Sequence, residues 1–168
     1  MAEYTLTDEP CPVPPEQRPL EEYGQFCRSW FFHWPAESTF SLLRPLLISW
    51  LVALPLSLLV TSGSWALRHH PLLLTAIAVL GANLLPLALL VRQWLGWRYL
   101  LQRLRSERIA YEESGWYDGQ EWEKPLAWRQ RDLLVARHQV GPVMRRLEMA
   151  LALVIALLLV GTCLCQAF

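Results

Sequence analysis

Charged residues are scarce in this 168-residue chain: they make up 18% of it, against 54% hydrophobic residues. This composition argues against an ordinary soluble domain, which carries more charge and fewer apolar residues. The formal net charge is zero, which gives no support to nucleic-acid binding. No apolar run of secretory length lies within the first 40 residues, so we expect no cleaved signal peptide.

The same N-terminal stretch lacks the Arg- and Ser-rich composition of an organelle transit peptide. It is acidic instead, with Glu3, Asp8, Glu9, Glu16, Glu21 and Glu22. We therefore expect the chain to be made in the compartment where it works, as in a cyanobacterium or from a plastid gene.

Cysteine and histidine are too few and too scattered to predict a metal centre or an active site. The four cysteines, Cys11, Cys27, Cys163 and Cys165, match neither a CxxC pair nor a zinc pattern. A haem held between helices needs histidines inside the spans, and there are none. The adjacent His69 and His70 remain weak candidates for binding a chlorophyll magnesium, ordinary loop residues being the alternative. We expect a protein that is not an enzyme.

Three uncharged stretches have the length of bilayer-spanning helices: Pro45 to Ser62, Leu72 to Val91, and Met149 to Cys165. At about 1.5 Å per residue each reaches roughly 25 to 30 Å, the thickness of a hydrocarbon core. We divide the chain accordingly into 1–44 (arm and interfacial segment), 45–62 (first span), 63–71 (short outer loop), 72–91 (second span), 92–146 (polar segment) and 147–168 (third span and C-terminus).

The arginines and lysines are segregated in a way that predicts orientation. Residues 1–44 and 92–146 together hold fourteen of the fifteen, and the 63–71 loop holds only Arg68. Because such residues collect on the side where the chain is made, we expect the N-terminus and 92–146 to be cytoplasmic or stromal. Pro55 and Pro86 predict kinks in the first two spans, with Asn83 placed to satisfy a freed carbonyl or to contact a neighbouring helix.

Apolar residues continue at helical spacing beyond the second span and before the third. The two stripes are Trp94, Trp97, Leu101 and Leu104, and then Leu133, Ala136, Val140, Val143 and Leu147. Together with the spans they predict an all-α membrane protein with three transmembrane helices, in which the second and third extend into a cytoplasmic helical hairpin. Pro142 predicts a further kink.

The segment 111–125 is predicted to be the loop at the tip of this hairpin. Gly115 suits a helix C-cap, Asp118–Gly119 a tight turn and Pro125 the first position of the next helix. Its carboxylates do not follow the spacing of a calcium loop, so we expect no metal there. Aromatic rings on a loop often anchor a partner, whereas packing back onto the hairpin is the rival interpretation. The expected partner-binding residues are Trp116, Tyr117, Asp118, Trp122, Arg103 and Arg105.

The N-terminal segment predicts a proline-rich extended arm followed by aromatic residues at the membrane surface. We expect residues 19–34 to be interfacial, with Phe26, Trp30 and His33 on one face of a short helix.

Four stretches of the sequence resemble one family: Cys11 to Tyr23, Trp30 to Pro35, Tyr111 to Pro125, and Arg131-Asp132 leading to Gln139-Val-Gly-Pro142. They look like the thylakoid membrane family described as conserved in the green lineage and diatoms, some of whose members are hypothetical chloroplast open reading frames. The resemblance runs from about Cys11 to Leu147. It implies a photosynthetic membrane in a cyanobacterium or plastid, and no reaction, since the family has carried a domain-of-unknown-function label.

We therefore expect a non-catalytic thylakoid membrane accessory or assembly factor that docks a photosynthetic complex, such as photosystem subunits, or its biogenesis machinery. Membrane lipid is the other expected partner, and no nucleic acid is expected. Two alternatives stay open: a pigment-, haem- or iron-handling membrane protein that uses His69 and His70, and an accessory subunit of a membrane transporter.

Overall fold

The computed structural model describes residues 12–111 and 120–167. Three helical stretches among them are long and apolar enough to cross a membrane: Thr39–Ser62, Pro71–Arg105 and Leu126–Gln166. The first is α3 (Thr39–Ser62), and the second is α5 (Pro71–Ala82) followed by α6 (Leu84–Arg105). The third is α7 (Leu126–Val135), the π-helix η2 (Ala136–Val140) and α8 (Gly141–Ala167). The predicted helical membrane protein with three spans is confirmed.

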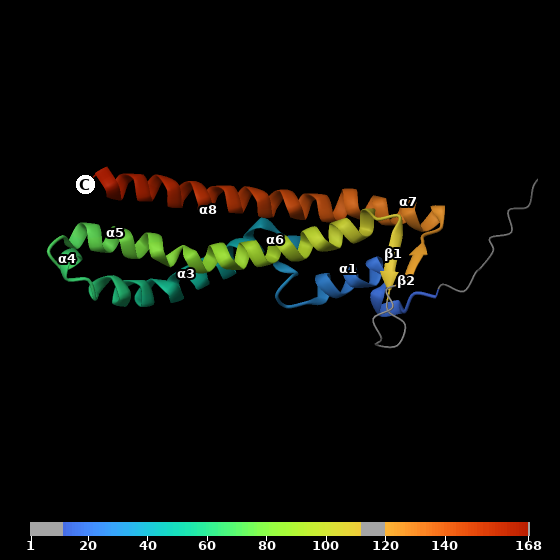
Figure 1. Cartoon of the computed structure of the whole chain (residues 1–168), viewed down its shortest axis with the longest axis horizontal. Helices are drawn as coiled ribbons and strands as arrows, with labels where there is room; N and C mark the ends of the chain where they lie inside the picture. Colours follow the sequence, from blue (N-terminus) through green and yellow to red (C-terminus); the bar gives the residue numbers. More distant parts are fainter. Residues whose placement is uncertain (1–11, 112–119, 168) are drawn as a thin grey trace, which may run out of the picture.

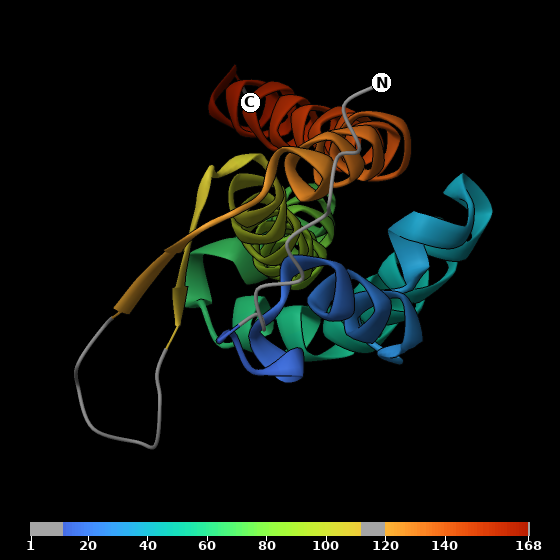
Figure 2. The same ribbon diagram turned by 90° about the vertical axis from the view of Figure 1, so that its right-hand side faces the viewer.

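Helices α5 and α6, which together form the second span, lie between the other two long helices, with α8 on one side and α3 on another (Figures 1 and 2). Two glycines permit close approach. A Cβ on Gly81 would lie 2.5 Å from Ser57 Oγ of α3, and one on Gly161 of α8 would collide with Leu80. Close packing of small residues is the usual way in which membrane helices associate, because lipid tails are as apolar as the side chains.

Each interruption of the helices lies near a proline. Pro86 cannot donate a hydrogen bond, and the helix breaks between Ala82 and Leu84. At this break the amide N–H of Asn83 donates to Leu80 O (3.0 Å), and its side-chain Nδ2 donates to Val79 O (2.8 Å). The Asn83 side chain thus satisfies the carbonyl of Val79 and not that of Ala82, which Pro86 leaves without its helical partner. The helix α3 runs on through Pro55.

Before Pro142 the chain forms the π-helix η2, in which Gly141 N–H donates to Ala136 O, five residues back. A single π-turn inserts an extra residue into the helical hydrogen-bond ladder and redirects the helix. The perturbation expected at Pro142 therefore takes this form.

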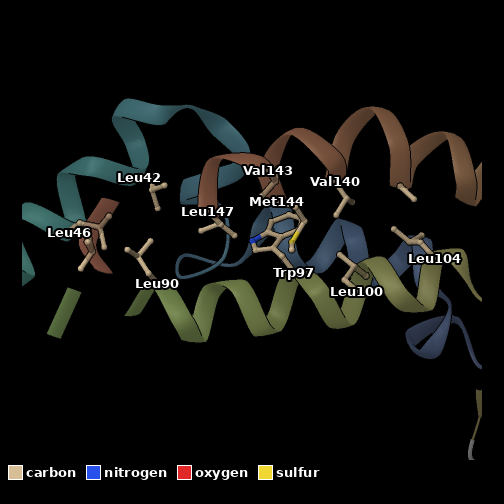
Figure 3. Close-up of a cluster of buried hydrophobic side chains, with 12 residues drawn as sticks. Leu42, Leu46, Leu90, Trp97, Leu100, Leu104, Val140, Val143, Met144 and Leu147 are labelled. Carbon is tan, nitrogen blue, oxygen red and sulfur yellow. The ribbon is translucent and has the colours of Figure 1, made fainter. Parts of the chain in front are cut away.

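The extensions of the second and third spans pack together as the predicted antiparallel hairpin (Figure 3). Its buried residues come mainly from α6, η2 and α8: Leu90, Trp97, Leu100, Leu104, Ala136, Val140, Val143, Met144 and Leu147. Leu100 was not in the predicted stripe, and Trp94 and Leu101 lie only half-buried beside it. Leu133, expected in the stripe, is exposed.

The tip of the hairpin differs from the predicted loop. The helix α6 ends at Arg105, well before Gly115, and the chain forms two strands, β1 (Arg108–Tyr111) and β2 (Gln120–Glu123). They pair antiparallel, with Arg108 opposite Glu123 and Ile109 opposite Trp122. The strands form because Ile109 and Tyr111 bury one face of this short ribbon. Pro125 directly precedes α7, whose first residue is Leu126.

The N-terminal segment folds onto α6. It contains η1 (Pro15–Gln17), α1 (Pro19–Arg28) and α2 (Trp34–Glu37), and a fourth short helix, α4 (Trp65–Arg68), joins α3 to α5. The predicted shared face of Phe26, Trp30 and His33 is wrong, because α1 ends at Arg28. Phe26 stacks on Phe32 (ring centroids 4.5 Å apart) and meets Trp97 of α6 edge-on at 5.5 Å, whereas Trp30 is 76% exposed.

Three side chains donate hydrogen bonds to backbone carbonyls of residues 31–35, the aromatic turn that precedes α3. Gln93 donates to Phe31 O, and Trp97 Nε1 donates to Phe32 O (3.2 Å). Arg146 of α8 donates to Pro35 O at 2.9 Å. Buried carbonyls need such donors, so this turn is attached to both long helices rather than resting only on a membrane surface.

Candidate docking site

The polar end of the bundle carries most of the ion pairs, and we call it the head: residues 12–28, 98–111 and 120–135. It joins the N-terminal arm and α1, the end of α6 with β1, and β2 with α7. In Figure 2 the two strands project sideways from the helices. The head is therefore the part of the chain whose geometry could present a surface to another protein.

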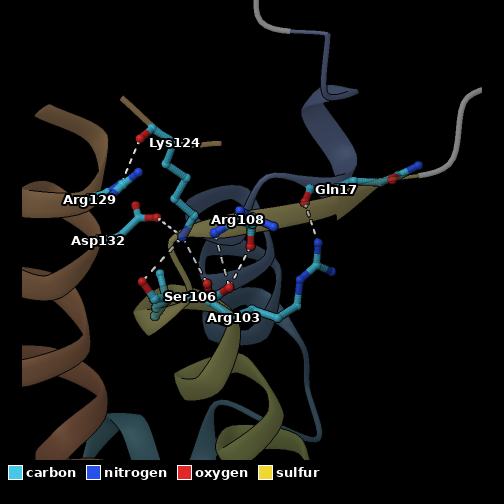
Figure 4. A network of polar contacts seen from close by, with 8 residues as sticks. Gln17, Arg103, Ser106, Arg108, Lys124, Arg129 and Asp132 are labelled. Atoms are coloured by element: carbon cyan, nitrogen blue, oxygen red, sulfur yellow. Dashed lines mark hydrogen bonds and ion pairs between the residues drawn. The ribbon is translucent and has the colours of Figure 1, made fainter. Parts of the chain in front are cut away.

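Lys124 lies at the centre of the head with its side chain fully buried. Its Nζ donates to Asp132 Oδ2 of α7 at 2.7 Å and to the carbonyls of Arg103 at 3.0 Å and Leu104 at 3.4 Å (Figure 4). The last carbonyls of a helix have no intrahelical partner and form the negative end of its dipole, so a cation is favourable there. One ammonium group thus caps α6 and binds α7 to it.

The Lys124–Asp132 ion pair is almost entirely removed from solvent, since the Asp132 side chain is only 2% exposed. Burying two charges is costly, and the pair is favourable only because hydrogen bonds satisfy it. Loss of one partner would leave the other charge buried and unpaired. This makes the relative placement of α6, β2 and α7 strongly dependent on two residues.

Arg129 of α7 holds the chain just before its own helix. Its Nε donates to Lys124 O at 2.8 Å, and its guanidinium pairs with Glu123 at 2.5 Å and Glu107 at 3.5 Å. Glu107 directly precedes β1 and Glu123 ends β2, so the two carboxylates lie at the same end of the strand pair, one beside each strand. The base of the ribbon is therefore attached to α7 from both sides.

Arg103 of α6 attaches the N-terminal segment. It pairs with Glu22 of α1 at 2.5 Å and donates to Gln17 O at 2.9 Å (Figure 4 shows the second contact). Burial raises the pKa of Glu22, and the nearby Arg103 charge opposes this rise. Glu22 Oε2 is buried with no hydrogen-bond partner in the described part of the chain, which explains why burial dominates.

A second small core lies under the ribbon. It consists of Val13 from the arm with Ile109 and Tyr111 from β1, and Trp122 packs against it. Trp122 also meets Trp128 of α7 edge-on, with ring centroids 5.5 Å apart. The arm, the ribbon and α7 thus share one apolar contact.

A cleft of about 140 Å³ opens between α1 and α7. Arg18, Glu21, Trp128 and Arg131 are among its lining residues. Arg18 is held in place, since its Nε donates to Val13 O at 3.2 Å and its guanidinium lies 5.6 Å from the centre of the Trp128 ring.

The structure separates the predicted partner-binding residues into three groups. Trp122 packs within the head, as the rival interpretation had it, and Arg103 is engaged with Glu22. Arg105 is exposed at the end of α6. Trp116, Tyr117 and Asp118 lie outside the described residues, between β1 and β2 in sequence.

The weak cofactor candidates His69 and His70 lie at the opposite end of the bundle from the head. They line a surface cavity of about 570 Å³ together with Leu72, Leu164 and Cys165, and the His69 ring meets Trp65 edge-on at 4.9 Å. Among the residues that the structure describes, no group of three or more His, Cys, Asp or Glu is placed to hold a metal ion.

Sequence reasoning missed Lys124, Asp132 and Glu22, which organise the head. One signal was available for Lys124: it is the single lysine among fifteen basic residues, all the others being arginine. Lysine is a compact charge with three donors, which suits convergence on two carbonyls and one carboxylate. For Asp132 and Glu22 no such signal exists, because ordinary surface helices carry acids at similar positions.

Comparison with known proteins gives a consistent result over nearly the whole chain. A family model described as "CGLD27-like: Conserved in the green lineage and diatoms 27" matches residues 11–153. An uncharacterized protein ycf36 of Cyanophora paradoxa is 37% identical over 148 residues, covering 88% of this chain and 93% of the relative. The ycf36 protein of Porphyra purpurea is 34% identical over 147 residues, covering 88% of this chain and 89% of the relative.

A longer plant relative is also similar. The chloroplastic protein of Arabidopsis thaliana named Conserved in the Green Lineage and Diatoms 27 is 36% identical over 140 residues, which is 83% of this chain and 43% of the relative. No solved structure matches the chain.

Proposed function

The chain belongs to the CGLD27-like family, and from that premise we propose that it is a non-catalytic accessory or assembly factor of the photosynthetic membrane. In this proposal the three spans anchor the chain, and the head docks a photosynthetic complex or its biogenesis machinery. A chloroplastic relative and three membrane-spanning helices make this a membrane protein of a plastid family. Its residence in the thylakoid, with the head on the cytoplasmic or stromal side, is part of the proposal.

The observation that carries the proposal is the buried Lys124–Asp132 pair at the base of the projecting ribbon. Such a pair contributes little net stability compared with apolar residues of the same volume, but it can specify one arrangement of the elements that it joins. A recognition surface benefits from being pre-organised, because less conformational freedom is then lost on binding. The head is built in this way, since three separate stretches of the chain meet there.

The test separates docking from folding. Because Trp122 packs inside the head, replacing it would disturb the structure as well as a surface. We therefore propose to replace only Trp116 and Tyr117 by Ala in the full-length protein, and to recover it from membranes with mild detergent. Co-purification of photosystem subunits or assembly proteins, identified by mass spectrometry, should fall by about tenfold or more, as for loss of a hot spot of at least 2 kcal/mol.

Trp65→Ala is the matched control, because Trp65 is an equally large ring, 77% exposed, at the opposite end of the bundle. It should leave the recovered partners unchanged. If the Trp116/Tyr117 variant retains the partners of the unmodified protein at the same level, docking through the residues that connect β1 and β2 in sequence is wrong.

A further inference from the structure

An apolar groove of about 580 Å³ runs along the spanning part of the bundle, between α3 and α8. Leu43, Leu46, Leu47 and Trp50 of α3 form one wall, Leu153, Val154, Leu157, Val160, Gly161 and Leu164 of α8 form the other, and Val79, Leu80, Asn83 and Pro86 form the floor. The groove exists because α3 and α8 each pack closely on the second span, at Gly81 and Gly161, rather than on one another along this stretch.

The dimensions of the groove match a single hydrocarbon chain. From Leu153 to Leu164 at about 1.5 Å per residue, it extends roughly 16 Å along α8. This is about half of a hydrocarbon core of roughly 30 Å, the depth of one leaflet. The volume also lies in the usual range for a site that holds one small molecule, about 300 to 1,000 Å³.

The chemistry of the lining is that of a hydrocarbon site. Asn83 is its one amide side chain, and its Nδ2 already donates to Val79 O at 2.8 Å. No charged side chain lines the groove. A polar ligand would find few partners here, whereas an acyl chain needs none.

Each helix that walls the groove carries an arginine within seven residues of its first lining residue, and neither arginine lines the groove itself. Arg44 is exposed on α3 between Leu43 and Leu47, and it makes no ion pair or hydrogen bond with the residues that the structure describes. Arg146 lies seven residues before Leu153, two helical turns along the same face of α8. Its Nη1 donates to Pro35 O at 2.9 Å, which keeps its guanidinium beside α2. The acid closest to Arg44 in sequence, Glu37, accepts a hydrogen bond from Ser41 at 2.8 Å. The acid closest to Arg146 is Glu148, two residues further along α8 and exposed.

We propose that this groove binds one acyl chain of an anionic glycerolipid, and that Arg44 and Arg146 bind its headgroup. Basic residues beside a gap between membrane helices are the established chemistry for recognising anionic lipids. The site lies in the spans and does not involve the head, so it goes beyond the docking role. Failure of one proposal would not contradict the other.

The experiment uses the purified full-length chain, delipidated in detergent and reconstituted into phosphatidylcholine vesicles that contain a minor share of phosphatidylglycerol. After gentle extraction, native mass spectrometry counts the lipids that each chain retains. The unmodified protein should retain one phosphatidylglycerol. Arg44→Gln should lower this retention about fivefold, which corresponds to about 1 kcal/mol for one basic residue near the surface.

Leu157→Trp fills the groove and should abolish the retention. Its matched control is Leu159→Trp, because Leu159 is 61% exposed on the same helix and does not line the groove. Arg137→Gln, on an exposed residue of η2, is the control for charge. Neither control should change the retained lipid.

Three results would overturn the proposal. The first is that the chain retains phosphatidylglycerol only in proportion to its share of the vesicle lipid, which would mean no selectivity for it. The second is equal retention in the Leu157→Trp and Leu159→Trp variants. The third is a chain-to-chain crosslink from a photoreactive residue at position 157, which would mean that a second copy occupies the groove.

Discussion

The head and the spanning bundle are stabilised in opposite ways. In the head, buried charges and carbonyl groups satisfy one another, as Lys124 does with Asp132 and the end of α6. In the spans, glycines allow close approach and the outer faces stay apolar: only 6% of the most apolar stretch of the third span is buried inside the protein. Lipid or partner helices must cover the remainder. The polar contacts that set the relative placement of the elements are therefore concentrated in the head.

The largest effect that this comparison predicts is at Lys124. Lys124→Met leaves Asp132 buried and unpaired, and such a loss typically costs about 3–5 kcal/mol. The midpoint of thermal unfolding in detergent, followed by circular dichroism, should fall sharply. The double variant Lys124→Met/Asp132→Leu removes both charges and should regain most of the lost stability.

The exposed pair of Arg108 and Glu121 is the control for this prediction, because both side chains lie more than half in solvent. Arg108→Gln should change stability by less than about 1 kcal/mol. If Lys124→Met is equally mild, the head does not depend on its buried charge pair.

A smaller effect is expected at Gly96, where aromatic packing rather than charge joins the N-terminal segment to α6. A Cβ there would lie 2.6 Å from Phe32 Cε1 and 3.4 Å from Phe26 Cε1. Overpacking costs about 1–3 kcal/mol, which exceeds the roughly 0.5–1 kcal/mol that Ala gains over Gly within a helix. Gly96→Ala should therefore lower the free energy of unfolding by about 1–2 kcal/mol in denaturant titrations.

Gly24→Ala in α1 provides the contrast, because a Cβ there would lie 3.6 Å from Arg28, an ordinary contact. This variant should be neutral or slightly more stable. Gly96→Ala/Phe32→Leu should recover part of the loss, since Leu vacates the space of the ring edge. No recovery would mean that the clash with Phe32 is not the cause.

The smallest effect concerns pH and the attachment of α1. Burial raises the pKa of Glu22 above its ordinary value of 4.5, so the folded chain binds its proton more tightly than the unfolded chain. Stability from this group is then fully present below pH 4.5 and is lost as pH rises through the folded-state pKa. As pH rises through this window, the unmodified protein should lose stability relative to the Glu22→Gln variant. Thermal unfolding measured at a series of pH values tests this.

Glu21→Gln is the neighbouring control, because Glu21 is exposed, and the pH profile of this variant should follow that of the unmodified protein. Parallel pH profiles for unmodified protein and Glu22→Gln would contradict burial as the dominant influence on this carboxyl group.

Periodicity and apolar length made the helical part of the fold predictable. The helical hairpin follows from residues such as Trp97, Leu104, Val140 and Leu147, whose spacing places them on facing sides of two helices. The strands at its tip were not predictable in the same way, since four-residue strands carry little pattern and their burial depends on Val13, far away in sequence. Of the candidate site residues, Trp122 and Arg103 turned out to be engaged inside the head.

Apolar length and helical periodicity are enough to predict three membrane-spanning helices and an elongated polar extension, because hydrocarbon thickness and helical geometry constrain residues that are close together in the chain. Three features become visible only in the folded chain: a single lysine caps α6 and pairs with α7, Arg103 attaches α1, and α3 and α8 leave an apolar groove between them. These features depend on contacts between segments far apart in sequence, where burial, and not residue type, sets the energy of a charge or the shape of a gap.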